Sequence, residues 1–203
     1  MDTGSWARRI AKQMKCLGAE FRNDELAYLA LTSKIEKPIV DRLAYNLHRD
    51  NKCACIAREW TSGNYSRGDL AVIVDRTPKL ILEAKAMYSF DMFANDAKKK
   101  YPEKVNKDVE KMQNFKPKGQ IERLAMILLT DTKVCPDEKY RGIVKYIDDL
   151  KKSEKSYDEL RCAVERNFEC RPIHSSGSIC AGRAFDVDVT VHYWLFGPLS
   201  TNN

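Results

Sequence analysis

Two short apolar runs, separated by a five-residue segment typical of a turn, constrain the fold of this chain most strongly. The runs are Asp69–Val74 and Leu80–Ala86, and the residues between them read DRTPK. Side chains alternate between the two faces of a strand, so Glu83 and Lys85 share one face. The sequence therefore predicts a β-hairpin that carries charged side chains beside apolar ones.

The register of this hairpin decides whether Asp69 joins the face of Glu83 and Lys85. Asp69 must lie opposite residue 83 or residue 85, and either pairing needs an odd-length loop or a β-bulge. A clean two-residue turn at Arg76-Thr77 would pair Asp69 with Ala84 and separate the two acids. Because bulges are common next to active sites, we predict a bulge and a shared face.

Two acids on one face of a hairpin repel each other unless a cation joins them. A divalent cation would remove that cost, and Mg²⁺ prefers hard oxygen ligands such as one or two carboxylates. The sequence thus predicts a metal site at Asp69 and Glu83, for Mg²⁺ with Mn²⁺ as its substitute. The histidines lack the spacing of metal ligands.

The tripeptide Glu83-Ala84-Lys85 differs in context from the other acid-x-Lys tripeptides of the chain, which lie in polar, helical or turn-like stretches. It lies within an apolar run that follows a second strand bearing an acid. Gly68-Asp69 followed by Glu83-Ala84-Lys85 resembles the PD-(D/E)XK signature of the restriction-endonuclease-like nucleases, with Gly68 where the family name has Pro. The resemblance covers residues 33–130 as helix, three strands, helix and strand.

This resemblance implies an α/β fold with a three-layer α/β/α restriction-endonuclease-like core and a mixed central sheet. We assign that core to residues 33–203 and treat residues 1–32 as an N-terminal helical extension. The implied activity is metal-dependent hydrolysis of DNA phosphodiester bonds by an endonuclease.

The resemblance also implies roles for individual residues. Asp69 and Glu83 would bind the cation, the backbone carbonyl of Ala84 would add a ligand, and Lys85 would orient or activate the attacking water. In such nucleases the first core helix often carries an acid that reaches the metal site, and Glu36 is our candidate. An alternative interpretation is equally good: Glu36 is an ordinary acid at the start of a helix, where the helix dipole favours negative charge.

Four further residues are candidate DNA contacts. Tyr65 and Arg67 lie in the turn-rich segment that leads to Asp69. It is equally possible to interpret this segment as an ordinary connecting loop without DNA contacts. Lys104 and Lys111 lie on an expected basic helix over residues 91–114, where surface ion pairs explain the same spacing.

Composition is compatible with this function. The chain has 203 residues, which fits one domain, and its formal net charge of +6 suits a polyanionic partner such as DNA. No apolar stretch approaches the roughly 20 residues that span a bilayer, and the N-terminus lacks an apolar signal core, so we expect a cytoplasmic protein without a membrane partner. Cuts in two strands would favour a homodimer.

The rest of the chain carries coarser expectations. Helices are expected over residues 5–31, 34–49 and 137–168, with Ser33 and Glu36 as a capping box. Strands are expected at Cys53–Trp60, Leu124–Thr130 and Phe185–Phe196, the last with one solvated face that includes His192 and Trp194. The Ser- and Gly-rich segment 174–182 is expected to be mobile.

Two other functions remain open from the sequence. The first is a nucleic-acid-binding protein on the same fold without turnover. The second is an unrelated α/β domain in which Glu83 and Lys85 form part of a cross-strand ion pair.

Overall fold

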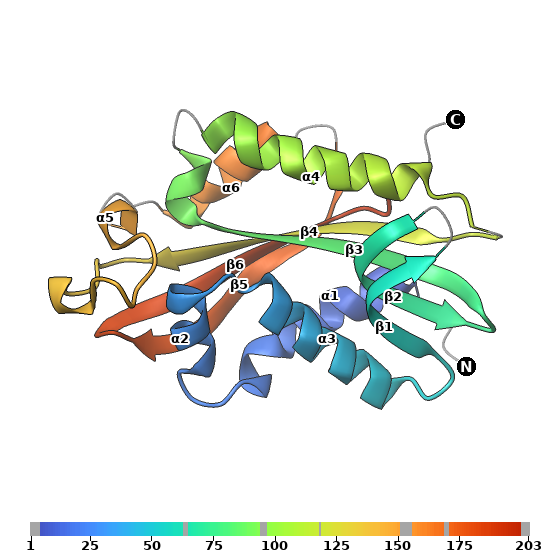
Figure 1. Cartoon of the computed structure of the whole chain (residues 1–203), viewed down its shortest axis with the longest axis horizontal. Coiled ribbons are helices and arrows are strands. Elements are labelled where there is room, and N and C mark those ends of the chain that lie inside the picture. Colours follow the sequence, from blue (N-terminus) through green and yellow to red (C-terminus); the bar gives the residue numbers. More distant parts are fainter. Residues whose placement is uncertain are drawn as a thin grey trace.

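Helices cover both faces of a six-stranded mixed β-sheet in the part of the chain that the structure describes (Figure 1). This computed structural model describes residues 5–62, 65–93, 97–117, 119–150, 156–168 and 171–199, with the backbone alone for 65–66 and 97–100. The strands are β1 (Cys55–Ser62), β2 (Tyr65–Val74), β3 (Thr77–Tyr88), β4 (Glu122–Thr132), β5 (Ile173–Ala184) and β6 (Val187–Phe196). The α-helices are α1 (Trp6–Cys16), α2 (Glu25–Thr32), α3 (Glu36–Asp50), α4 (Ala97–Asn114), α5 (Ile147–Leu150) and α6 (Tyr157–Asn167). Short 3₁₀ helices are η1 (Leu17–Glu20), η2 (Ser89–Met92) and η3 (Glu138–Tyr140).

The strand order is β1-β2-β3-β4-β6-β5. Strands β3 and β4 form the parallel pair, and the other neighbours are antiparallel. A parallel pair needs a crossover connection, and α4 lies within the segment that joins β3 to β4. The mixed central sheet that we expected is therefore present.

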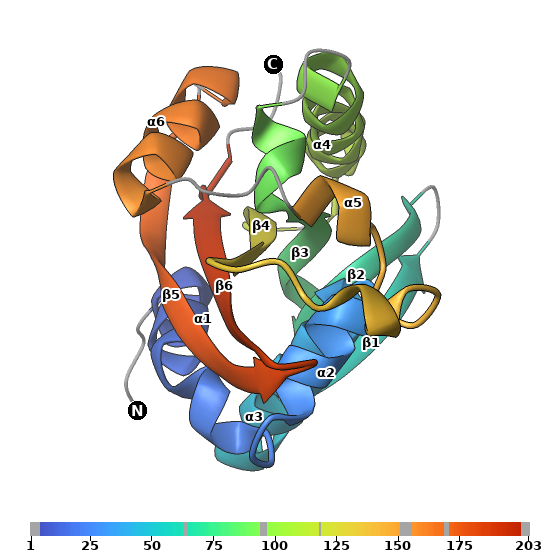
Figure 2. The same ribbon diagram turned by 90° about the vertical axis from the view of Figure 1, so that its left-hand side faces the viewer.

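Two hydrophobic clusters lie on opposite faces of the sheet. One contains residues of α1, α2 and α3, and the other contains residues of α4 and α6 (Figure 2). Strand β4 supplies both: Leu124 and Met126 belong to the first cluster, while Ala125 and Ile127 belong to the second. This explains the continuous apolar run of β4 and confirms the prediction of a central buried strand.

The N-terminal helix α1 is attached to the sheet by a carboxylate. Glu122, at the start of β4, accepts hydrogen bonds from the Ser5 hydroxyl at 2.6 Å and from the backbone N–H groups of Trp6 at 2.9 Å and Ala7 at 2.8 Å. An acid at a helix N-terminus satisfies donors that have no partner within the helix. Residues of α1, including Ile10, are fully buried in the same cluster as the strands.

The prediction of a mobile segment at 174–182 is wrong, because these residues form most of β5. Strand β5 pairs with β6 from Ile173↔Phe196 to Ala184↔Val187, and the tight turn between the two strands contains Phe185 and Asp186. The polar composition reflects an edge strand with many exposed side chains. Pairing with β6 therefore overrides the weak strand propensity of Ser and Gly.

The expected solvated face of β6 is also partly wrong. His192 and Trp194 are buried, and the Tyr157 ring of α6 stacks on Trp194 with ring centroids 6.1 Å apart. The residues of β6 from Val191 to Phe196 are all buried and contribute to the hydrophobic clusters on both faces of the sheet. Asp186 and Asp188 are exposed, as the sequence predicted.

The start of α3 differs from the expected capping box. The Ser33 hydroxyl donates to the carbonyl of Leu29 at 2.9 Å, and Ile35 is the residue that precedes the helix. The side chain of Glu36 is directed elsewhere, to a backbone N–H of β3. The first strand begins two residues later than we expected, at Cys55.

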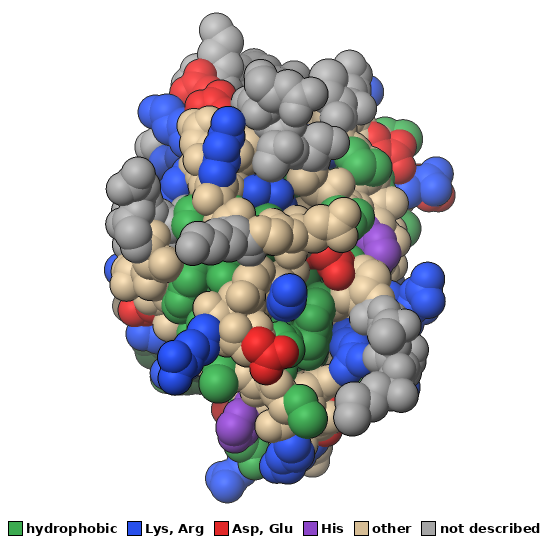
Figure 3. Space-filling view, turned by 90° about the vertical axis from the view of Figure 1, so that its right-hand side faces the viewer, with side chains coloured by type: hydrophobic (Ala, Val, Ile, Leu, Met, Phe, Trp, Pro, Cys, Tyr) green, Lys and Arg blue, Asp and Glu red, His purple; other side chains and the backbone are tan. Residues whose placement is uncertain are grey.

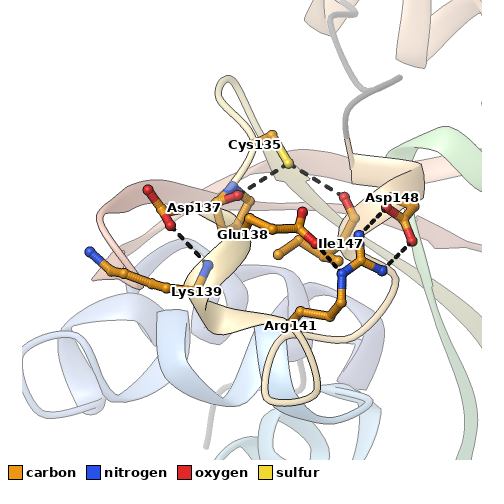
Figure 4. Close-up of polar contacts among 8 residues, drawn as sticks. Cys135, Asp137, Glu138, Lys139, Arg141, Ile147 and Asp148 are labelled. Atoms are coloured by element: carbon orange, nitrogen blue, oxygen red, sulfur yellow. Dashed lines mark hydrogen bonds and ion pairs between the residues drawn. The ribbon is translucent and has the colours of Figure 1, made fainter.

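The segment between β4 and α5 is held by polar contacts of its own (Figure 4). The Arg141 guanidinium donates to both carboxylate oxygens of Asp148 at 2.8 and 2.7 Å and also pairs with Glu138. The thiol of Cys135 contacts the carbonyl of Ile147 at 3.4 Å. Among the described residues, no helix is long and apolar enough to cross a membrane, and the six described cysteines are free thiols.

Candidate active site

The hairpin of β2 and β3 has the register that the candidate site requires. The turn contains Asp75 and Arg76, and a bulge between Val72 and Ile73 shifts the pairing by one residue. Beyond the bulge Leu70 pairs with Leu82, so the next position along each strand sets residue 69 against residue 83. The bulge predicted from the sequence is present. It sets Asp69 opposite Glu83, so by the alternation of side chains both positions belong to the same face of the hairpin.

Strand β2 separates from β3 just at this position. Its pairing with β3 ends at Leu70↔Leu82, whereas its pairing with β1 continues to Ser62↔Tyr65. The edge of β3 beyond Leu82 therefore presents backbone groups that β2 no longer pairs. Two carboxylates accept from them: Asp69 from the N–H of Ala84 at 2.7 Å, and Glu36 from the N–H of Ala86 at 3.0 Å.

The carbonyl of Ala84 belongs to the same edge. In an antiparallel ladder the N–H and C=O of one residue point to the same neighbouring strand. Because the N–H of Ala84 is directed to Asp69, its carbonyl oxygen also projects into the opening between β2 and β3. The site thus offers a backbone oxygen beside a carboxylate.

Glu83 and Lys85 are directed toward α4, where each meets a residue of opposite charge. The Glu83 carboxylate forms an ion pair with Lys111, and the Lys85 ammonium lies 3.1 Å from the Asp108 carboxylate. The side chain of Glu83 is only 7% exposed, so its charge depends on a nearby cation. Strand and helix are therefore joined by two neighbouring ion pairs.

The surroundings keep Lys85 charged. Burial is the largest single influence and lowers its pKa, but the nearby Asp108 carboxylate raises it, with smaller contributions from Glu36 and Asp69. The net result is a pKa above the ordinary value for lysine. Lys85 is thus a cation at neutral pH.

The structure brings together four of the predicted residues around one stretch of β3. Asp69 and Glu36 lie at the free edge of the strand, and both act electrostatically on Lys85, which follows Glu83 by two residues. In the described part of the chain no group of three or more acid, histidine or cysteine side chains is placed to hold a metal ion. The metal site expected at Asp69 and Glu83 therefore stays a prediction.

The four predicted DNA contacts lie in different surroundings. Lys111 lies in the site, where its ammonium also donates to the carbonyl of Arg67 at 2.6 Å. Arg67 is exposed and, with Asp69 and Glu36, lines a pocket of about 120 Å³ between α3 and the strands. Lys104 is exposed on α4, and its ammonium lies 5.5 Å from the centre of the Tyr101 ring. The side chain of Tyr65 lies outside the described residues.

Asp108 is a residue of the site that was not among the candidates predicted from the sequence. Its signal was present: Asp108 and Lys111 are three apart on one helix face, and Glu83 and Lys85 are two apart on one strand face. In both pairs the acid precedes the lysine, so Glu83 meets Lys111 and Lys85 meets Asp108 when the helix runs antiparallel to the strand. Which helix covers that face depends on tertiary packing.

Figure 3 shows the face of the molecule at the right-hand side of Figure 1. Lys and Arg side chains are dispersed there among hydrophobic and acidic ones rather than gathered into one patch.

Comparisons with known proteins place this site in no family. A scan against protein-family models found no match, and searches of curated proteins and of solved structures found no significant match either.

Proposed function

We propose that this protein is a metal-dependent nuclease that hydrolyses DNA phosphodiester bonds on a three-layer α/β/α restriction-endonuclease-like core. One observation carries the proposal: where β2 leaves β3, the Asp69 carboxylate bonds the Ala84 peptide, next to Glu83 and a protonated Lys85. Two acids and a lysine thus come from adjoining positions of β2 and β3, and Asp69 also lines a neighbouring pocket.

The order of the elements supports the same core. Helix α3 is followed by β1, β2 and β3, then by the crossover helix α4 and the parallel strand β4. This is the order of helix, three strands, helix and strand that the sequence resemblance implied.

The donors fit a small divalent cation. Asp69 and Glu83 would supply two carboxylate oxygens and Ala84 a carbonyl oxygen, and Mg²⁺ commonly takes the rest of its ligands from water and substrate phosphate. Mn²⁺ would substitute for it. When bound, the cation would lower the pKa of a water molecule and offset charge on the phosphate and leaving oxygens.

The protein's own residues would perform the remaining tasks. Lys85 remains protonated, so it would donate to the phosphate or to the attacking water and stabilise the negative charge that develops. Glu36 holds the Ala86 peptide and, with Asp108, keeps Lys85 charged. Lys85 would therefore act as a cation rather than as a general base.

DNA is the proposed substrate because the chain carries a formal net charge of +6 and basic residues flank the site. Arg67 and Lys111 lie beside the acids, and Lys104 is exposed on the same helix as Lys111. Cutting two strands would favour a symmetric dimer.

Cleavage assays test the proposal. Supercoiled plasmid and linear single- and double-stranded DNA would be incubated with Mg²⁺, Mn²⁺ or EDTA. Glu83→Ala and Lys85→Ala would be compared with Glu110→Ala and Lys107→Ala, whose side chains are exposed on α4. We expect metal-dependent cleavage that both site variants lose and both controls keep. Cleavage that survives Glu83→Ala would contradict the assigned site.

A DNA-binding protein without turnover is the second candidate. It is favoured by the ion pair of Glu83 with Lys111, which neutralises the buried acid by means of the protein alone. DNA binding without any divalent-cation binding would identify this function instead.

A further inference from the structure

We propose that Lys111 is a built-in substitute for the divalent cation. It neutralises Glu83 in the cation-free site, and cation binding displaces it toward the phosphate of the substrate. This inference rests on the proposed function, because it needs a cation at Asp69 and Glu83.

The ammonium of Lys111 contacts both β2 and β3. It pairs with the Glu83 carboxylate of β3 and donates to the Arg67 carbonyl of β2 at 2.6 Å. Arg67 precedes Asp69 by two residues, so the ammonium joins the two strands that carry the proposed ligands. A single positive charge thus lies beside a proposed metal ligand.

A divalent cation and this ammonium would compete for the same carboxylate. Glu83 is nearly buried and faces α4, so one cationic partner satisfies it, and two positive charges beside it would repel each other. The divalent cation has the higher charge, and Asp69 would bind it as a second carboxylate ligand beside Glu83. Lys111 would therefore leave Glu83 when the cation binds.

Helix α4 can stay in place while Lys111 moves. The second ion pair, between Asp108 and Lys85, lies one turn away along the helix and involves neither proposed metal ligand. The side chain of Lys111 is 29% exposed and has a flexible four-carbon stem, so its ammonium can turn to the surface without moving the backbone. At the surface it would meet the phosphate of a substrate held by the cation.

Calorimetric titration of Mn²⁺ into the full chain, without DNA, tests the exchange. Removing the competitor in Lys111→Ala should tighten Mn²⁺ binding, by roughly fivefold or more on the usual scale of coupled binding. The control is Lys107→Ala, which removes the same charge from an exposed position on the same helix. It should leave the Mn²⁺ affinity within about twofold of the wild type.

A second readout follows Lys111 itself. With Ca²⁺ present, Lys111→Ala should bind DNA more weakly than the wild type, whereas in EDTA the two should bind alike. Lys111→Arg, which keeps the positive charge, should not tighten Mn²⁺ binding. Circular dichroism would establish that each variant is folded, and Lys111→Met would replace Lys111→Ala if that variant is not.

The outcomes separate the inference from the proposed function. Wild-type Mn²⁺ binding that disappears in Glu83→Gln supports the proposed metal site. If that holds but Lys111→Ala binds Mn²⁺ no more tightly than the wild type, or no more tightly than Lys107→Ala, the inference is overturned and the function stands. If the wild type binds no Mn²⁺, both are overturned.

Discussion

At the scale of single residues, the charge of Lys85 is the feature on which the proposed chemistry depends. Burial alone would favour the neutral amine, and a neutral lysine could accept a proton. The Asp108 carboxylate at 3.1 Å, together with Glu36 and Asp69, outweighs burial and raises the pKa of Lys85. A residue outside the hairpin therefore decides which chemistry the hairpin lysine can perform.

Replacing Asp108 should change the pH dependence of cleavage. In Asp108→Asn the pKa of Lys85 should fall, so the alkaline limb of the cleavage profile should move to lower pH while the acid limb stays in place. A raised lysine pKa stabilises the fold below the unfolded pKa and loses that effect as pH rises through the folded pKa. The variant should therefore lose stability at neutral pH, and the difference should disappear in strong alkali.

The measurement is a pH–rate profile for the wild type, Asp108→Asn and Asp158→Asn, an exposed control on α6. An alkaline limb that does not move in Asp108→Asn would show that Lys85 does not titrate in this range of activity.

Glu36 should contribute to stability through its contact with the backbone. Glu36→Ala removes the acceptor of the Ala86 N–H and should cost about 1–2 kcal/mol in free energy of unfolding. Glu36→Gln keeps a carbonyl acceptor and should recover most of that loss. Urea denaturation of the three proteins measures both changes, and equal losses for Ala and Gln would contradict the hydrogen-bonding role.

At the scale of elements, the sequence predicted what alternation and local turns determine. The hairpin, its bulge and the shared face of Glu83 and Lys85 follow from patterns within about twenty residues. The contacts of α4 and the extent of β5 do not, because they depend on pairing between distant segments. Asp108 was visible as a helix residue, but its contact with Lys85 requires the crossover of the fold.

The contact between β5 and the start of α2 gives a test at this scale. Gly182 has a φ of +99°, and a Cβ there would lie 2.5 Å from Oδ1 and 2.9 Å from Cα of Asp24. The neighbouring N–H of Arg183 donates to the same Asp24 carboxylate at 2.6 Å. Gly182→Ala should therefore suffer both backbone strain and a steric clash.

The control is Gly142→Ala, whose φ of +87° is similar but whose Cβ would meet nothing within 4 Å. Gly142→Ala should lose about 1 kcal/mol from strain alone, and Gly182→Ala should lose at least about 1 kcal/mol more. Denaturant midpoints compare the two, and equal losses would mean that α2 does not pack closely on β5.

At the scale of the whole molecule, we predicted from the sequence that residues 1–32 form a helical extension of the core. In the structure α1 and α2 bury residues such as Ile10 and Leu26 in the cluster on one face of the sheet. Glu122 of β4 also holds the first turn of α1. The short N-terminal helices thus cover strands that would otherwise expose apolar side chains.

Removing residues 1–32 should therefore prevent cooperative folding of the remainder. The chain of residues 33–203 should show no sharp thermal transition by circular dichroism and should aggregate, because apolar side chains on one sheet face would lose their cover. The full chain is the reference. A truncated chain with a cooperative transition close to that of the full chain would establish residues 1–32 as a dispensable extension.

The most direct test of the proposed function is a crystal structure of the full chain soaked with Mn²⁺, with anomalous scattering used to locate the ion. We predict a peak within about 2.0–2.5 Å of carboxylate oxygens of Asp69 and Glu83 and of the carbonyl oxygen of Ala84. A well-ordered site without a peak there, or with Mn²⁺ bound only elsewhere, would contradict the metal centre and the nuclease function that depends on it.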